Sequence, residues 1–158
     1  METLPYHELE EETINFIGQA NRMVLATCAQ SRVTARTMSV INRGLVICFQ
    51  TDLEYTKTGQ IRQNPNVAPC AGNMQLEGTA RFAGPPLADP WFAENYRRVH
   101  ERAFQKYSHL ESDVIIEVEP RLVTFWKYDA GHNPYRDYLD LVERRAYREV
   151  YEKALTRS

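Results

Sequence analysis

Three strand-like segments follow one another early in the chain, and the links between them are too short for anything but tight turns. Residues 23–29 are mostly apolar, residues 32–41 are rich in β-branched side chains, and residues 45–50 are again mostly apolar. Gln30-Ser31 and Asn42-Arg43-Gly44 separate these segments, and the glycine suits a turn position with positive φ. Because parallel neighbours need a long crossover, the pattern predicts an antiparallel meander.

Further strand-like segments bring the total to about six to seven strands. They share a short apolar or alternating pattern and lie at residues 67–71, 74–83, 114–119 and 122–128. Gly78 predicts a bulge or a barrel corner, and Pro120 separates the last two strands. We expect one mainly β domain over residues 1–158, built as a small antiparallel β-barrel with flanking helices.

Four segments are expected to be helices, three of them from apolar residues at helical spacing and residues 51–63 from the proline that follows them at position 65. The first three segments cover residues 6–20, 51–63 and 89–107, and the third is an amphipathic insertion between strands. The fourth covers residues 134–155, where Pro134 suits a first helical turn and apolar side chains recur from Tyr138 onwards. The sequence therefore predicts an N-terminal helix, a short helix after the meander, an inserted helix and a C-terminal helix.

Composition and charge argue against several kinds of partner. A net charge of -2 and a pI near 6.1 provide no broad cationic surface, so nucleic acid is not an expected partner. The acidic N-terminus and the lack of a long apolar run predict a cytoplasmic protein without a membrane partner. Three cysteines, Cys28, Cys48 and Cys70, stand in apolar stretches and are expected to be reduced and buried. No His or Cys spacing predicts a metal site.

Arg36 and Lys57 are the first candidate binding residues. A strand arginine offers a planar fork to two oxygens, and a lysine at a helix start combines its charge with free backbone N–H groups, so the two can converge on a phosphate. Thr51 and Thr56 would add hydroxyl donors. The alternative is that both cations are solvated surface charges, and that Thr51-Asp52-Leu53-Glu54 is a capping box opening the short helix.

Six motifs occur in a characteristic order. They are V-L-A-T near residue 25, A-R-T-M-S-V from residue 35, F-Q-T-D from residue 49, K-T-G-Q-I from residue 57, N-P-N-V-A from residue 64 and Q-L-E-G-T-A-R from residue 75. In this order and spacing they resemble the pyridoxamine 5′-phosphate oxidase-like family of FMN-binding split β-barrels, over about half of the chain. The resemblance implies a split barrel and a homodimer that holds FMN at the subunit interface.

The resemblance also implies which residues bind FMN. Those that match the family's phosphate and flavin positions are Arg36, Thr37, Met38, Ser39, Gln50, Thr51, Thr56, Lys57, Gln75 and Trp126. Three of them have other interpretations: Met38 as a core residue, Gln50 as an exposed strand end and Gln75 as a cross-strand hydrogen-bonding residue.

The match departs from the oxidase after Trp126. Pro134 stands where the oxidase has a histidine, and Arg136 lies at the distance of the oxidase's last arginine, where we interpret it as a helix-surface charge. This chain therefore lacks part of the residue set that the oxidase uses for its phosphorylated substrate. We do not expect this chain to oxidise pyridoxamine phosphate.

Two functional hypotheses remain. No Rossmann, P-loop, nucleophile-elbow or zinc-protease signature occurs, so the first is an FMN-dependent oxidoreductase that transfers hydride or electrons to an unidentified small molecule, with NAD(P)H as a candidate reductant and no assigned catalytic side chain. The second is a non-catalytic module that holds a flavin or haem for sensing, storage or electron handover. A deazaflavin is a further alternative cofactor.

Overall fold

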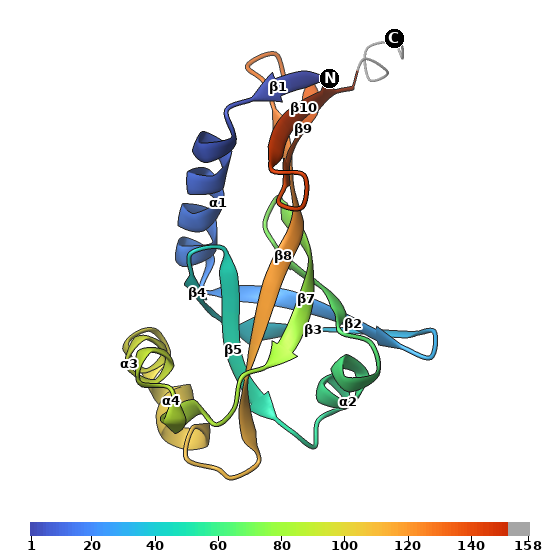
Figure 1. Cartoon of the computed structure of the whole chain (residues 1–158). Coiled ribbons are helices and arrows are strands. Elements are labelled where there is room, and N and C mark those ends of the chain that lie inside the picture. Colours follow the sequence, from blue (N-terminus) through green and yellow to red (C-terminus); the bar gives the residue numbers. More distant parts are fainter. Residues whose placement is uncertain (152–158) are drawn as a thin grey trace.

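The computed structural model describes residues 1–151 as one curved antiparallel sheet with helices around it (Figure 1). The mainly β fold with flanking helices is confirmed, but these residues form ten strands, more than the six or seven predicted. The strands are β1 (Glu2–Leu4), β2 (Arg22–Ala29), β3 (Arg32–Ser39), β4 (Ile41–Arg43), β5 (Val46–Asp52), β6 (Asn66–Ala71), β7 (Met74–Phe82), β8 (Asp113–Tyr128), β9 (Pro134–Asp140) and β10 (Arg145–Val150). The helices are α1 (Tyr6–Ala20), α2 (Thr56–Gln63), α3 (Pro90–Val99) and α4 (Glu101–Tyr107), with a 3-10 turn η1 (Pro86–Ala88) before α3.

The predicted early hairpins are present, with one subdivision. Gln30 and Ser31 join β2 to β3 with φ of 50° and 61°, and Gly44 joins β4 to β5 with φ of 59°. The second predicted strand is divided at Val40, so that β3 pairs with β2 while β4 pairs with β5. Because of this division β3 does not pair with β5, and residues of both strands line the cavity described below.

Strand β8 is the spine of the sheet. Its 16 residues pair in turn with β5, β7 and β9. The break predicted at Pro120 is absent because Pro120 lies opposite Gly78, at the bulge where the β7–β8 register shifts. A Cβ on Gly78 would lie 2.7 Å from the Glu119 carbonyl oxygen, so the close approach of the two strands requires glycine there.

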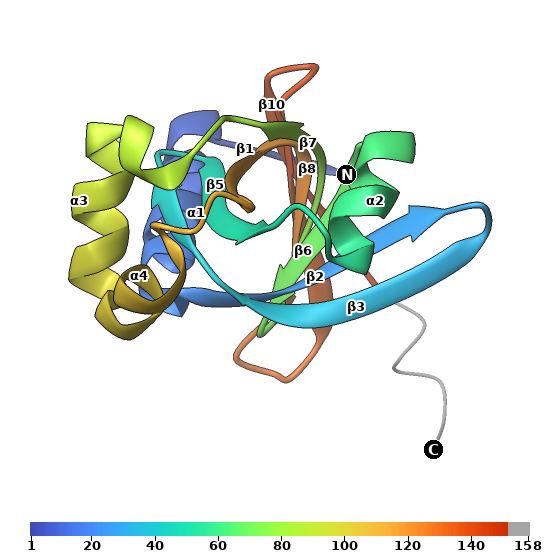
Figure 2. The same cartoon turned by 90° about the horizontal axis from the view of Figure 1, so that it is seen from below.

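Two apolar clusters make up the core. The larger one lies inside the curved sheet and under α1, with Phe49, Met74 and Phe125 among its fully buried side chains. The smaller one lies under α3, where Phe92 and Tyr96 pack on Ile115 of β8. Figure 2 shows α3 and α4 on one side of the sheet and α2 on the other. The helices thus flank the sheet, as the sequence predicts.

The predicted C-terminal helix over residues 134–155 is wrong. Residues 134–140 and 145–150 are strands β9 and β10, and the remainder of the predicted helix beyond residue 151 lies outside the described residues. Alternation explains the outcome: Asp137 and Leu139 are buried while Arg136 and Tyr138 are half-buried on the other face. The edge of β8 offers hydrogen bonds to this alternating segment, and a helix would leave that edge unpaired.

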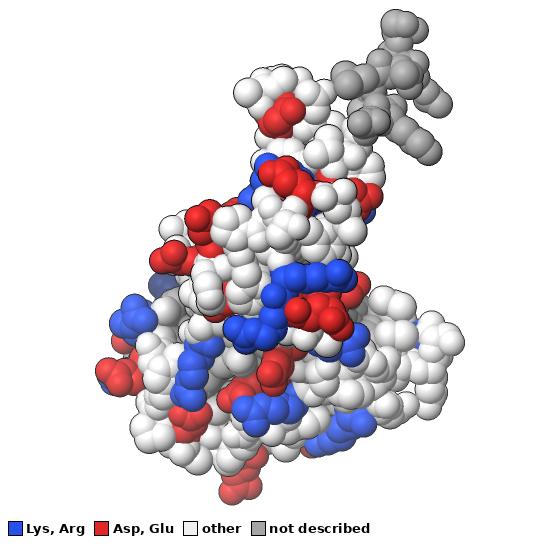
Figure 3. Space-filling view, turned by 45° about the horizontal axis from the view of Figure 1, so that its top comes forward, with Lys and Arg blue, Asp and Glu red and all other residues white. Residues whose placement is uncertain are grey.

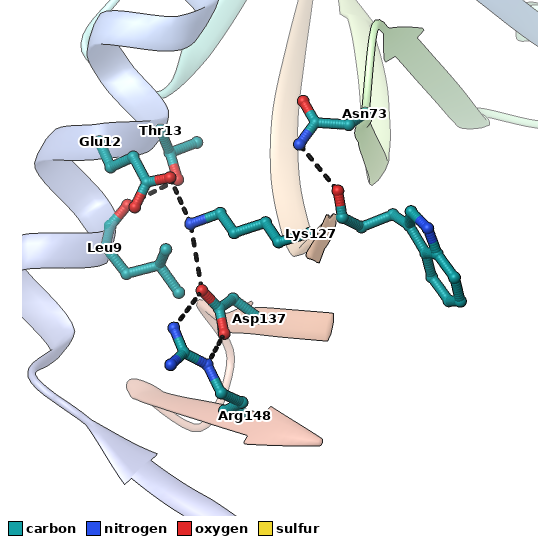
Figure 4. A network of polar contacts seen from close by, with 8 residues as sticks. Leu9, Glu12, Thr13, Asn73, Lys127, Asp137 and Arg148 are labelled. Atoms are coloured by element: carbon teal, nitrogen blue, oxygen red, sulfur yellow. Dashed lines mark hydrogen bonds and ion pairs between the residues drawn. The ribbon is translucent and has the colours of Figure 1, made fainter. Parts of the chain in front are cut away.

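An ion network around the buried Asp137 connects β9 and β10 to α1 (Figure 4). Asp137 accepts from Arg148 Nε at 2.7 Å and Nη2 at 3.0 Å, and it accepts from Lys127 Nζ at 3.1 Å. Lys127 also pairs with Glu12 on α1. Burial alone would raise the pKa of Asp137, but the hydrogen bonds from Arg148 and Lys127 outweigh it and hold the pKa below its usual value. This network fixes α1 against β8 and β9.

The predicted inserted helix is present but broken. Helix α3 ends at Val99 and α4 begins at Glu101, with His100 between them at φ of -129°. A ring nitrogen of His100 lies 2.8 Å from the Val40 carbonyl oxygen, which anchors the break to the sheet.

None of the helices in residues 1–151 is both long and apolar enough to cross a membrane.

On the face shown in Figure 3, basic and acidic residues lie interspersed. All three cysteines are free thiols, as predicted, but only Cys48 is buried; Cys28 is half-buried and Cys70 is exposed, because it alternates outward on β6.

Candidate functional site

A cavity of about 340 Å³ lies between β3, the end of β5, the start of α2 and the α3–α4 pair. Seven of the ten predicted site residues line it, namely Arg36, Thr37, Met38, Ser39, Gln50, Thr51 and Lys57. Its other lining residues include Asp52, Tyr55, Tyr96, Tyr107 and Asp113. The size suits a small organic ligand.

Arg36 reaches this cavity from β3, and hydrogen bonds to β2 and β3 hold its guanidinium in place. Nη1 donates to the Leu25 carbonyl at 3.0 Å and to Thr27 Oγ1 at 2.9 Å, and Nη2 donates to Thr34 Oγ1. Three of the five N–H donors are thus used, which leaves Nε–H and one Nη2–H without a partner among the described residues. Burial lowers the pKa of Arg36.

Lys57 is the second residue of α2, at the position predicted for it, and only 8% of its surface is exposed. Burial, and then the nearby charge of Arg36, lower the pKa of Lys57 to about 8. Its Nζ lies 4.6 Å from the centre of the Tyr55 ring, and it makes no ion pair within residues 1–151. A buried cation beside a second cation is expensive without an anion, so this end of the cavity favours an anionic ligand.

The predicted capping box at Thr51 is wrong. Helix α2 begins at Thr56 after Tyr55, because Thr51 and Asp52 continue β5, and the Asp52 carboxylate instead accepts from the Glu54 backbone N–H at 2.8 Å and from Ser112 at 2.7 Å. Thr51 Oγ1 and Asp113 Oδ2 are the buried side-chain atoms that lack a hydrogen-bond partner among the described residues. Both residues line the cavity, so a ligand there would meet two unsatisfied polar atoms.

Helices α3 and α4 form the opposite wall. Tyr96 is buried, Tyr107 is 40% exposed, and both line the cavity. Ser108 donates to Gln50 Oε1 at 2.7 Å, which ties the segment after α4 to β5. Burial, and then the charge of Asp113, raise the pKa of Tyr96, so its phenol stays protonated near neutral pH. This wall can pack against a planar ring and donate a hydrogen bond.

Three predicted site residues lie elsewhere. Thr56 is exposed and faces a shallow hollow beside the β2–β3 turn. Gln75 and Trp126 line a separate groove on the outer face of β7, β8 and β9, together with Arg136. The prediction of Arg136 as a helix-surface charge is wrong, since it lies on β9 with its guanidinium carbon 4.9 Å from the centre of the Trp126 ring.

A second hollow of about 390 Å³ lies over β2, β6 and β7, but its lining carries a different chemistry. Small neutral residues such as Ala26, Ala68 and Gly78 dominate it, and Arg121 and Glu77 carry its charges. It lacks the two neighbouring cations and the unsatisfied polar atoms of the first cavity. The cavity at Arg36 and Lys57 is therefore the candidate site.

Sequence reasoning missed Asp113 and Tyr96. Asp113 begins the apolar strand 113–118, and a charged residue in that position was the one available signal. Tyr96 lies in the segment 89–107, for which the sequence predicts only an amphipathic helix, and the packing of α3 places it at the cavity.

Comparison with known proteins gives two findings. The model of the family described as pyridoxamine 5′-phosphate oxidase matches residues 9–127, which include both cations and most of the cavity. No curated protein sequence matches the chain.

Three solved structures have a similar fold. General stress protein 26 from Bacillus anthracis is 23% identical, with a TM-score of 0.57 over 73% of this chain and 92% of that one. A pyridoxamine 5′-phosphate oxidase-related, FMN-binding protein from Nostoc punctiforme is 14% identical, with a TM-score of 0.59 over 92% and 94%. HutZ, the haem storage protein from Vibrio cholerae, is 12% identical, with a TM-score of 0.56 over 76% and 91%. At these identities the likeness shows the fold alone.

Proposed function

This chain belongs to the pyridoxamine 5′-phosphate oxidase family, and on that premise we propose that it is an FMN-binding oxidoreductase acting on a small molecule. The observation that carries the proposal is the pair Arg36 and Lys57. One buried cation, Lys57, and one half-buried cation, Arg36, lie at one cavity, and neither has an ion-pair partner among the described residues. A phosphate would supply the missing negative charge, and its oxygens would accept hydrogen bonds from the free backbone N–H groups at the start of α2.

The flavin ring would lie along β3. This strand pairs with β2 on one edge only, and its residues Thr37, Met38 and Ser39 line the cavity. Backbone N–H and C=O groups of the unpaired edge can therefore bond the polar edge of an isoalloxazine. Thr51 Oγ1 and Asp113 Oδ2 can bond ribityl hydroxyls, which are both donors and acceptors.

FMN fits this cavity better than haem does. Haem iron in proteins takes an axial His, Cys, Met or Tyr ligand. The described lining has no His or Cys; it offers only Met38 and three tyrosines, of which Tyr96 is held as a protonated phenol by burial. The paired cations instead suit one phosphate. A deazaflavin that carries a phosphate on its ribityl chain would use the same residues, so a flavin-type cofactor is the shared conclusion.

We extend the proposal to a homodimer in which Gln75 and Trp126 serve the partner's cofactor. They lie outside their own chain's cavity, in an outer groove with Arg136 and Tyr138. Tryptophan, tyrosine and arginine are the residue types that anchor protein interfaces. A second copy seated on this face would bring Gln75 and Trp126, two of the three matched residues outside the cavity, to the flavin, as the family resemblance implies.

FMN, when bound, supplies the hydride or electron chemistry. The chain's own residues would bind the phosphate, orient the flavin ring and provide a proton donor for the substrate. Arg36 and Lys57 would hold the phosphate, β3 would orient the ring, and Tyr96 would present a protonated phenol to a substrate from the α3 wall. NAD(P)H in the cytoplasm is the reductant we propose.

The test compares FMN with riboflavin, which lacks the phosphate. Replacing both Arg36 and Lys57 with alanine should weaken FMN binding by roughly tenfold or more per residue, because each hydrogen bond to a charged group contributes about 1.5–3 kcal/mol. Riboflavin binding should change little. Arg32→Ala with Arg62→Ala is the matched control, since both are exposed arginines on the same strand and helix. Equal loss of riboflavin and FMN binding would reject the phosphate assignment.

Catalysis has its own test. The FMN-loaded protein should oxidise NADH or NADPH with a model acceptor faster than the same concentration of free FMN, and Tyr96→Phe should reduce that rate more than it weakens FMN binding. Turnover no faster than that of free FMN would instead favour the non-catalytic module, a role for which the fold shared with a haem storage protein is a precedent.

A further inference from the structure

Gln60 occupies a buried position between α2 and the β2–β3 hairpin, with 6% of its surface exposed. Its Oε1 accepts from Thr27 Oγ1 at 2.5 Å and from Thr34 Oγ1 at 2.7 Å. Its Nε2 donates to the Arg32 carbonyl at 3.1 Å. Because only the nitrogen can donate to a carbonyl, this last bond fixes the orientation of the amide and directs its oxygen toward the two threonines.

The amide oxygen fixes the direction of both hydroxyl groups. A hydroxyl has one hydrogen, and Thr27 and Thr34 each direct it to Gln60. Their oxygens therefore present lone pairs to the guanidinium of Arg36. Thr27 Oγ1 accepts from Nη1 at 2.9 Å, and Thr34 Oγ1 accepts from Nη2. The two hydroxyl oxygens lie 3.2 Å apart, close enough to flank one guanidinium together.

Helix α2 carries both Gln60 and Lys57. They are three residues apart and thus share one face of the helix. Lys57 reaches the cavity directly, whereas Gln60 acts on Arg36 through the threonines. One helix therefore sets the positions of two cations that come from different elements.

We infer that Gln60 is a positioning residue for phosphate recognition: through Thr27 and Thr34 it fixes the Arg36 guanidinium so that two N–H donors, Nε–H and one Nη2–H, remain for a phosphoryl group. The ligand class, a phosphorylated cofactor, rests on the proposed function. The fixing of the guanidinium does not, because it is a property of the protein without ligand.

The first experiment measures FMN and riboflavin affinities of Gln60→Leu. We expect FMN binding to weaken roughly tenfold, as for the loss of one hydrogen bond to a charged group, and riboflavin binding to stay the same. Gln63→Leu is the matched control, because Gln63 lies on the same helix and bonds Gln30 of the same hairpin at 3.1 Å. In an Arg36→Ala background the effect of Gln60→Leu should vanish, and an undiminished effect there would overturn the inference.

The second experiment observes the guanidinium of Arg36 by ¹⁵N NMR in the ligand-free protein, assigned by its loss in Arg36→Ala. A fixed guanidinium gives separate Nη signals, and a freely rotating one gives averaged signals. We expect separate signals in the native chain and in Gln63→Leu, and averaged signals in Gln60→Leu.

Thr34→Val provides a second variant in case Gln60→Leu fails to fold, and it should also average the Arg36 signals because it removes one acceptor. Unchanged separate signals in the folded variants would overturn the inference. If the native chain fails to bind FMN, the proposed function falls, while the NMR result still decides whether Gln60 positions Arg36.

Discussion

Asp113 is the lining carboxylate whose pKa is raised by its surroundings. It is 5% exposed, and burial, followed by the charge of Asp52, raises its pKa to about 6 against an opposing effect of Lys57. In the unfolded chain an aspartate ionises near pH 4. Between about pH 4 and pH 6 the folded state therefore binds more protons at Asp113 than the unfolded state does. This residue lowers the free energy of unfolding as the pH rises through that window.

Asp113→Asn should remove this dependence. We expect the variant to gain stability relative to the native chain as the pH rises from about 4 to about 6, because asparagine stays neutral throughout. Urea unfolding of the ligand-free protein at several pH values measures the difference. Glu111→Gln, an exposed neighbour in the same turn, is the control. A stability difference that is constant with pH would contradict the assignment.

Lys57 predicts a second pH dependence, in cofactor binding. Its pKa of about 8 means that the ligand-free protein loses this charge above that pH. The ratio of FMN to riboflavin affinity should therefore fall as the pH rises past about 8, and riboflavin corrects for ionisation of the ring. Lys57→Arg keeps its charge and should flatten the profile. An equally steep fall in that variant would show that another group is responsible.

Single residues show where prediction from sequence succeeds. The placement of Arg36 and Lys57 at one cavity could be predicted because their spacing to the meander and to the helix start is local, and the phosphate that we propose as their ligand comes from the family resemblance. Gln60 and Asp113 could not, since their roles depend on which distant strand or helix packs beside them. Thr51 misled because a capping box and a strand end share the same residue types.

Among the elements, β9 and β10 show the limit of periodicity. Tyr138, Leu139, Leu141 and Val142 fit a helical stripe, yet the alternation of Asp137 and Leu139 with Arg136 and Tyr138 is what the structure uses. Sequence cannot show that β8 extends past Pro120 and offers an unpaired edge. The α1 and α3–α4 segments lie close to their predicted bounds because no neighbouring edge competes for them, whereas Thr51 and Asp52, predicted to open α2, pair with β8 as the end of β5.

The β7–β8 bulge gives a prediction at this scale. Gly78→Ala should destabilise the protein by about 1–3 kcal/mol, because the added Cβ would meet the Glu119 carbonyl at 2.7 Å and Val118 Cγ1 at 2.8 Å. Gly59→Ala, in α2 with nothing within 4 Å of its Cβ, should instead stabilise by about 0.5–1 kcal/mol. Chemical unfolding measures both. A neutral Gly78→Ala would mean that the two strands separate there without cost.

At the scale of the whole molecule, the outer face of β7, β8 and β9 carries a groove lined by aromatic residues and an arginine. Trp126, Arg136 and Tyr138 lie on it, beside the stacked Tyr138–Tyr147 pair. If the proposed dimer forms through this face, Trp126→Asp should convert it into a monomer while the β-sheet spectrum is kept, because a carboxylate would be buried in the interface. Val142→Asp, at an exposed apolar position in the β9–β10 turn, should leave the dimer intact. Light scattering after gel filtration decides, and an unchanged mass for Trp126→Asp would place the interface elsewhere.

The most direct measurement is a visible absorption spectrum of the purified protein, with acid release of any chromophore and titration of the ligand-free chain with FMN. Binding at Arg36 and Lys57 predicts flavin bands in the near ultraviolet and blue, FMN in the released fraction, and FMN binding tighter than riboflavin binding. A Soret band, or a colourless protein whose addition leaves the spectrum of FMN unchanged, would contradict it.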